Sequence, residues 1–208
     1  MPSPKIELIE SKFNDWLAKA MRKFELQKPQ LLAAREFLKT RRAIRLSVPG
    51  VGDRWLVFSF DELQISATPP ADASTLATVS VDATSLDTVL WLLEEFEDTE
   101  LPSIDWSIIG RLADPKLQQS LGSNRLAFDL IITDFPSELP DLRLRCGIGF
   151  EDVPSIASFG AVLSFDDIED LLAGELSPHQ LIARSRLTGD SSKAVALGMF
   201  LLNPQSKP

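Results

Sequence analysis

The chain has 208 residues, of which 44% are hydrophobic and 25% charged, a composition typical of a globular protein that buries roughly 70% of its unfolded surface. The net charge of −9 is uneven: residues 1–45 hold eleven Lys and Arg against five acids, and the remainder holds ten against twenty-five. An acidic body repels phosphate backbones, so we expect no nucleic-acid partner.

The first segment, "SPKIELIESKFNDWLAKAMRKFEL" at 3–26, has the spacing of an amphipathic helix. Its apolar side, flanked by lysines, could contact a membrane interface or a partner through Phe13, Trp16, Leu17, Lys19, Lys23 and Phe24. The alternative, which we favour, is that this side packs on the protein's own sheet or on a second copy in a homodimer. A second helix is predicted from "KPQLLAAREFLKT" at 28–40.

Short alternating runs follow at 43–48, 54–60, 62–67 and 76–81, and they predict four strands of an antiparallel meander. The glycines of "PGVGD" precede a strand and not a helix, so they indicate a hairpin turn and not a dinucleotide-binding loop. "TSLDTVLWLLEEFED" at 84–98 predicts a helix with Thr84 as N-cap and Asp87 in the capping-box position.

The same order of patterns then returns. Alternating runs at 126–134, 141–150 and 158–165 predict strands, and "DDIEDLLAGELSP" predicts a helix that ends at Gly174. Ser177, Pro178 and Gln180 predict the start of another helix. A short strand, "ARSRLTGD", and a terminal helix, "SSKAVALGMFLLN", complete the chain.

The two halves share further features. "ATVSVD" at 77–82 aligns with "AVLSFD" at 161–166, and a helix is predicted after each. We interpret this as a diverged duplication, with N-terminal helices at 1–42, one unit at 43–122 and a second at 123–208.

The stretch "LLAGELSPHQLIARSRLTGDSSKAVALGMFLL", with "GAVLSFDDIEDLLAG" before it, resembles the C-terminal half of the sterol carrier protein family of nonspecific lipid-transfer proteins. The close resemblance covers residues 158–202; the strands at 126–150 agree in pattern, and the first half agrees more weakly. The lysine-rich strand usual in the family is replaced by "ARSRLTG", and Ala173 stands where threonine is common. The resemblance implies an α+β fold, a twisted five-stranded sheet covered by helices, with an apolar tunnel for fatty acyl chains, sterols or similar lipids.

We therefore expect a non-enzymatic lipid-binding or lipid-transfer protein without cofactor or metal, whose ligand is an apolar small molecule such as an acyl chain, a sterol-like lipid or an isoprenoid. The predicted tunnel lining consists of Phe165, Ile168, Leu171, Leu172, Leu181, Ile182, Val195, Leu197 and Met199. Gly198, on the same side of the last helix, would allow close helix packing or leave room for ligand. The alternative is a structural or interaction module with a filled core, which dimerises or supports a membrane-associated enzyme complex.

Other chemistry has little support. His179 is the single histidine, with no cysteine nearby, so a metal site or a hydrolytic triad is not expected. Cys146 lies on the apolar side of an alternating strand and is predicted to be a buried thiol. Arg184 and Arg186 could face solvent, pair with local acids, or hold a lipid carboxylate at a tunnel mouth. A single cysteine favours a reducing compartment, and neither a signal peptide nor a bilayer-spanning run is evident, so we expect a cytoplasmic protein.

Overall fold

The computed structural model has an α+β fold, and it describes residues 3–27, 40–59, 63–97 and 125–202. The first half contains α1 (Pro4–Gln27), β1 (Arg42–Val48), β2 (Gly52–Phe58), β3 (Leu63–Ser66), β4 (Ser74–Val81), the 3-10 helix η3 (Ala83–Ser85) and α2 (Leu86–Glu95). The second half contains β5 (Leu126–Thr133), η4 (Pro136–Glu138), β6 (Leu142–Ile148), β7 (Phe159–Ser164), α5 (Phe165–Ala173), α6 (Pro178–Arg184), β8 (Arg186–Gly189) and α7 (Ser191–Leu202). The helix predicted at 28–40 falls almost entirely outside the described residues.

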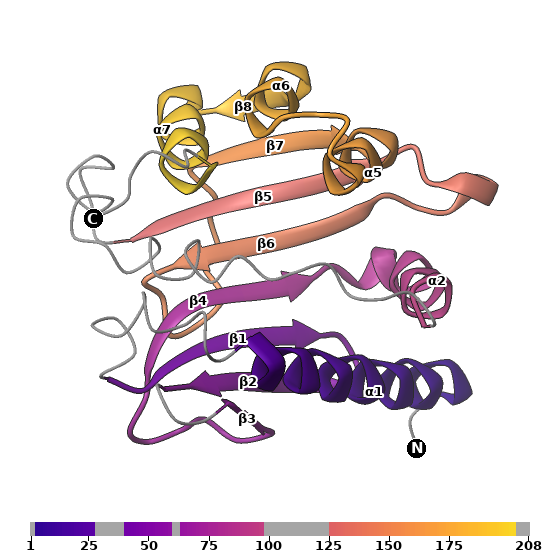
Figure 1. Ribbon diagram of the computed structural model, residues 1–208, viewed down its shortest axis with the longest axis vertical. Coiled ribbons are helices and arrows are strands. Elements are labelled where there is room, and N and C mark those ends of the chain that lie inside the picture. Colours follow the sequence, from indigo (N-terminus) through magenta and orange to yellow (C-terminus); the bar gives the residue numbers. More distant parts are fainter. Residues whose placement is uncertain (1–2, 28–39, 60–62, 98–124, 203–208) are drawn as a thin grey trace.

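All eight strands form one mixed sheet in the order β3-β2-β1-β4-β6-β5-β7-β8 (Figure 1). The predicted meander is correct for β1, β2 and β3, which pair antiparallel in sequence. It is wrong for β4, which returns across the sheet and pairs parallel with β1. A parallel partner requires a long crossover, and the segment after β3 supplies it.

The same pairing pattern occurs twice along the sheet. β1 pairs antiparallel with β2 and parallel with β4, and β5 likewise pairs antiparallel with β6 and parallel with β7. Helix α2 follows β4 after one turn of 3-10 helix, and α5 follows β7 directly. Five consecutive strands, β3-β2-β1-β4-β6, have the same sequence of relative directions as β4-β6-β5-β7-β8, because β4–β6 and β7–β8 are both antiparallel. The sheet thus contains two equivalent five-stranded windows that share β4 and β6.

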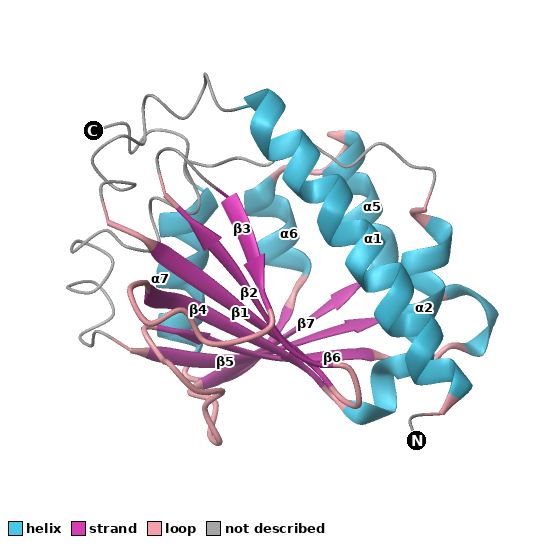
Figure 2. Cartoon of the chain, turned by 90° about the horizontal axis from the view of Figure 1, so that it is seen from below, coloured by secondary structure: helices cyan, strands magenta, loops and turns pink. Residues whose placement is uncertain are grey.

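The helices cover one face of the sheet (Figure 2). Near one edge, α1 lays Ile9, Phe13 and Leu17 against Val48, and partly buried residues of β1, β2 and α2 complete this cluster. The prediction that the apolar side of α1 packs on the protein's own sheet is confirmed for Phe13 and Leu17, which are buried, so these two are not free to contact a membrane. Trp16 is half-buried and stacked on Phe13. The Phe24 side chain lies outside the described residues.

Two lysines of α1 form ion pairs with acids in α2 or just after it. Lys5 forms an ion pair with Asp87, and Lys12 forms one with Glu97 at 2.7 Å. The hydrogen bond to Glu97 raises the pKa of Lys12, and burial works against it. Lys19 and Lys23 are half-buried. The charged border of α1 therefore contributes to docking this helix beside α2 in the first half of the molecule.

The helix boundaries follow local capping, with one correction. Gly174 adopts a left-handed conformation, φ 79°, and ends α5 as predicted, while Ser177 and Gln180 form the predicted capping box. Before α2, however, the capping side chain is Asp82, which accepts from the Thr84 backbone N–H, and not Thr84 itself. A turn of 3-10 helix separates this cap from α2, so the α-helix begins at Leu86, one residue later than Thr84 as N-cap would place it.

Candidate functional site

The floor of the candidate site is the apolar side of β5 and β7. Side chains alternate along a strand, and Phe128, Leu130 and Ile132 therefore point to the same face. The parallel register places Leu130 opposite Ala161 and Ile132 opposite Leu163. Helix α7 packs on Phe128, so this is the face that the helices cover.

Two buried clusters lie at opposite ends of this floor. At the start of β5, Leu126 and Phe159 pack with Ala194 and Leu197 of α7. At the end of β5, Phe135, Leu142 and Phe165 form the second cluster together with partly buried side chains of α2. The Phe135 and Phe165 ring centroids are 4.7 Å apart, and Trp91 of α2 meets both rings edge-on. Side chains of both halves therefore close this end.

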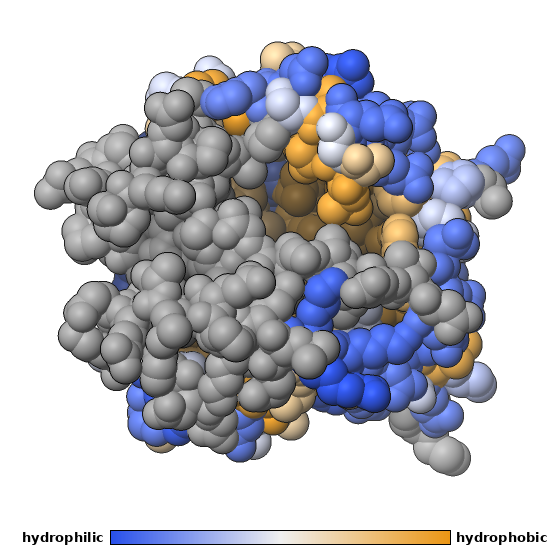
Figure 3. Space-filling view, viewed as in Figure 1, coloured by the Kyte–Doolittle hydropathy of each residue, from blue (hydrophilic) through white to orange (hydrophobic). Residues whose placement is uncertain are grey.

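Between the two clusters the floor is not fully covered. Leu130, Ala161 and Leu163 are half-buried, and none of them belongs to either cluster of the described residues. The space-filling view shows a hollow lined by apolar side chains on this side of the molecule, with hydrophilic side chains along its upper and right-hand borders (Figure 3). We call this feature the apolar hollow. Its chemistry is that of a site for an apolar group, because no charged side chain lies on this side of β5.

The predicted tunnel residues differ in burial. Phe165, Leu181 and Leu197 are buried, and Phe165 and Leu197 belong to the two end clusters. Ile168, Leu171 and Ile182 are half-buried. Met199 lies in α7, and its side chain is outside the described residues.

Two of the predicted lining residues are corrected. Leu172 is 58% exposed and Val195 is 43% exposed, so neither side chain belongs to the wall of an enclosed cavity. Leu172 follows the half-buried Leu171, and Val195 follows the buried Ala194. Adjacent helical positions differ by about 100°, so an apolar residue next to a core position can face solvent.

Gly198 brings α6 and α7 together. A Cβ atom at this position would lie 2.7 Å from the Cδ1 atom of Ile182, which is far closer than van der Waals contact allows. Of the two roles expected for this glycine, the structure shows close helix packing, because the Ile182 side chain occupies the space.

Neither arginine near the end of α6 is placed to hold a lipid carboxylate. Arg184 donates to Asp167 at 2.6 Å and lies 3.9 Å from Asp170, both on α5. Arg186 is opposite Val162 in the sheet, and Val162 is opposite Ile131 on the face without helices. Of the three roles considered, Arg184 takes that of pairing with local acids.

The Arg184–Asp167 pair predicts a dependence of stability on pH. The hydrogen bond from Arg184 holds the pKa of Asp167 below its ordinary value of 3.8, against a smaller effect of burial. A lowered folded-state pKa stabilises the fold above the unfolded-state pKa, and this contribution is lost as the pH falls through the folded value. We expect Asp167→Asn to destabilise the protein at pH 7 and progressively less below pH 4 in urea unfolding. The exposed neighbour Asp166, for which the described residues show no ion pair, supplies the control Asp166→Asn; an equal effect of both variants at every pH would contradict the prediction.

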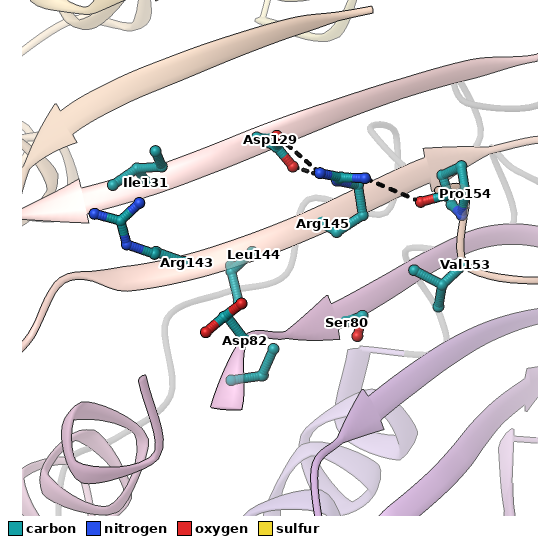
Figure 4. Close-up of a pocket in the computed structure, with 10 residues that line it drawn as sticks. Ser80, Asp82, Asp129, Ile131, Arg143, Leu144, Arg145, Val153 and Pro154 are labelled. Carbon is teal, nitrogen blue, oxygen red and sulfur yellow. Dashed lines mark hydrogen bonds and ion pairs between the residues drawn. The ribbon is translucent and has the colours of Figure 1, made fainter. Parts of the chain in front are cut away.

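The face without helices carries a polar pocket of about 370 Å³. Ser80, Arg145 and Asp129 form a row across β4, β6 and β5, as Figure 4 shows. Arg145 donates through two nitrogens to the Asp129 carboxylate and through Nη1 to the Pro154 and Ser155 carbonyls. These bonds fasten the β6–β7 connection over the sheet, so this arginine serves packing.

Arg45 of β1 holds the same connection. It donates to the Glu151 carbonyl and to Asp152, and its second nitrogen pairs with Asp53 at 2.8 Å. Burial raises the pKa of Asp53, but the hydrogen bonds from Arg45 and Ser47 outweigh it, so the net direction is downward. Sequence reasoning did not find this polar network; alternate Arg residues in β6 were its one signal, and the partners of Arg145 lie on β5 and in the β6–β7 connection.

The remaining candidates for reactive chemistry have ordinary surroundings. Cys146 is buried on the apolar face, as predicted, and burial raises the pKa of its thiol to about 12, which leaves it protonated at neutral pH. His179 is exposed in the first turn of α6. Within the described ranges, no group of three or more His, Cys, Asp or Glu could hold a metal ion. The same residues contain no helix with the length and apolarity needed to cross a bilayer.

Comparison of the chain with protein-family models, curated proteins and solved structures finds no significant match to any of them.

Proposed function

We propose that the protein is a non-enzymatic, cytoplasmic carrier that binds the apolar part of a lipid in the apolar hollow. One observation carries the proposal: Leu130, Ala161 and Leu163 form an apolar floor that is only half-buried between two well-packed clusters. Exposed apolar surface in a concave place is typical of a binding site. Each methylene that a ligand buries there contributes about 0.8 kcal/mol, so an acyl, sterol-like or isoprenoid group can bind with few polar contacts.

The strand pattern supports a sterol-carrier-like origin. The resemblance of residues 158–202 implies a twisted five-stranded sheet covered by helices, and the sheet contains two equivalent five-stranded windows. We propose that the chain is a tandem duplication in which each unit completes its five strands with strands of the other. In the first window, Ile9, Phe13 and Leu17 of α1 fill the space above the sheet. The second window keeps the hollow, so binding is assigned to it alone.

The filled first window also supports a second candidate function. A unit whose helix face is packed by α1 has the properties of a structural module, and the whole protein could serve as an interaction module that dimerises or supports a membrane-associated enzyme complex. The two candidates differ in what the second window does, and a ligand-binding measurement separates them.

The test is native mass spectrometry of the freshly purified protein with lipid extraction, followed by titration with Nile red, a neutral dye that fluoresces in apolar sites. We expect a co-purifying lipid or stoichiometric dye binding. Leu130→Trp should weaken dye binding about tenfold because the indole occupies the hollow, a cost of roughly 1.4 kcal/mol. The matched control is Ile131→Trp, since Ile131 is the next residue of the same strand and lines the polar pocket on the other face.

A folded protein that carries no lipid and binds no dye would overturn the carrier function and favour the interaction module. Equal weakening by both tryptophan variants would overturn the assignment of binding to the hollow. Circular dichroism and unfolding curves of both variants separate lost binding from lost folding.

A further inference from the structure

The helices around the apolar hollow carry an excess of negative charge. Helix α5 has four acids and no base, and α2 has three acids and no base. Helices α6 and α7 carry one base each, Arg184 and Lys193. Both helices α2 and α5 contribute apolar side chains to the cluster that closes one end of the hollow, so the helices that carry these acids flank that end. On α2, Asp87 is paired with Lys5 of α1.

The two bases on this border are engaged with carboxylates. Arg184 pairs with Asp167 at 2.6 Å, and Lys193 lies 3.5 Å from Asp190. In contrast, Asp166 and Glu169 of α5 are exposed, and the described residues show no ion pair for either. Among the described residues of α5, α6 and α7, the charges that show no ion pair are therefore negative.

We propose that the apolar hollow selects lipids with a positively charged head group, such as an amine or quaternary ammonium, and discriminates against lipid anions such as fatty acid carboxylates. This inference rests on the proposed carrier function and names its ligand class. Unpaired acids at the border attract a cationic head that remains in water while the tail lies on Leu130, Ala161 and Leu163. The same acids repel a carboxylate, and no free base of the described border offers it a partner. Through water, one charge about 10 Å away contributes only about 0.4 kcal/mol, so several acids together give a preference of roughly three- to tenfold.

The experiment compares three ligands with the same twelve-carbon tail: dodecyltrimethylammonium, 1-dodecanol and dodecanoate. Each displaces Nile red from the full chain at low salt and at 0.5 M salt, below its micelle concentration. We expect the ammonium compound to displace the dye about three- to tenfold more tightly than dodecanoate at low salt, with dodecanol between them. High salt should reduce this ratio to near one, because charges in water are screened over a few ångströms.

Two double variants locate the effect. Asp166→Asn with Glu169→Gln removes two acids from α5 and should reduce the preference at least twofold. Glu7→Gln with Asp15→Asn removes two exposed acids from α1, over the other end of the sheet, and should leave it unchanged (Figure 1). Dodecanoate displacing the dye as tightly as the ammonium compound would overturn the selectivity and leave the carrier function standing. Equal effects of the two variants would overturn the role of the α5 border, and no dye binding at all would overturn the carrier function itself.

Discussion

Replacing Phe165 with alanine is expected to lower the free energy of unfolding by about 3–5 kcal/mol, the range for a buried Phe truncated in a packed core. Phe165 is 7% exposed, and its ring centroid lies 4.7 Å from that of Phe135 and 5.6 Å from that of Trp91. Contacts of this geometry contribute about 0.5–1.5 kcal/mol beyond the area they bury. The loss is large because three elements, α2, α5 and the β5–β6 connection, meet at this ring.

The matched control is Leu172→Ala on the same helix. Leu172 is 58% exposed, so its truncation should change the free energy of unfolding by less than about 0.5 kcal/mol. Urea unfolding followed by tryptophan fluorescence measures both variants. Equal destabilisation by the two variants would mean that Leu172 is buried in the protein, as its predicted place in the tunnel lining requires.

The ring cluster also joins the two halves of the chain. Trp91 comes from the first half and Phe165 from the second, and they touch above the shared strands β4 and β6. Because the strands of both halves belong to one sheet, a variant that loosens this contact should destabilise both halves together. We therefore expect the wild type and Phe165→Ala each to unfold in a single transition in urea.

The sequence predicted the strands better than their order. Alternation of apolar residues identified strands such as β1, β5 and β6, in which one side faces the core. It could not distinguish a fourth meander strand from one that crosses back, since β4 shows the same alternation in either place. The repeat of "ATVSVD" in "AVLSFD" was the better indicator, because both segments are the strand that pairs parallel with the first strand of a hairpin.

The candidate site shows where periodicity stops being informative. Leu171 and Leu172 are chemically identical neighbours, yet one is half-buried and the other exposed. A wide apolar stripe on a helix as short as α5 does not determine which of two neighbouring leucines points inward. The packing of α5 against α6 and β7 determines it. In the same way, Gly198 was compatible with room for ligand until the position of Ile182 was known. The hollow itself lies between two clusters of the described residues, and its position depends on how β5, β7 and the helices pack, which no single segment of the sequence records.

Leu17→Ala is the second variant with a large expected effect, a loss of about 2–5 kcal/mol in the free energy of unfolding. Leu17 is 1% exposed and packs with Ile9 and Phe13 in the cluster beneath α1. The control is Leu8→Ala, because Leu8 lies on the same helix and is 42% exposed; it should change stability by less than about 0.5 kcal/mol. Measuring both by urea unfolding, together with binding to anionic vesicles, decides between the two roles of this helix. A core role predicts that Leu17→Ala destabilises the protein strongly, whereas a membrane role predicts normal stability and weaker vesicle binding, a result that would contradict the packing described here.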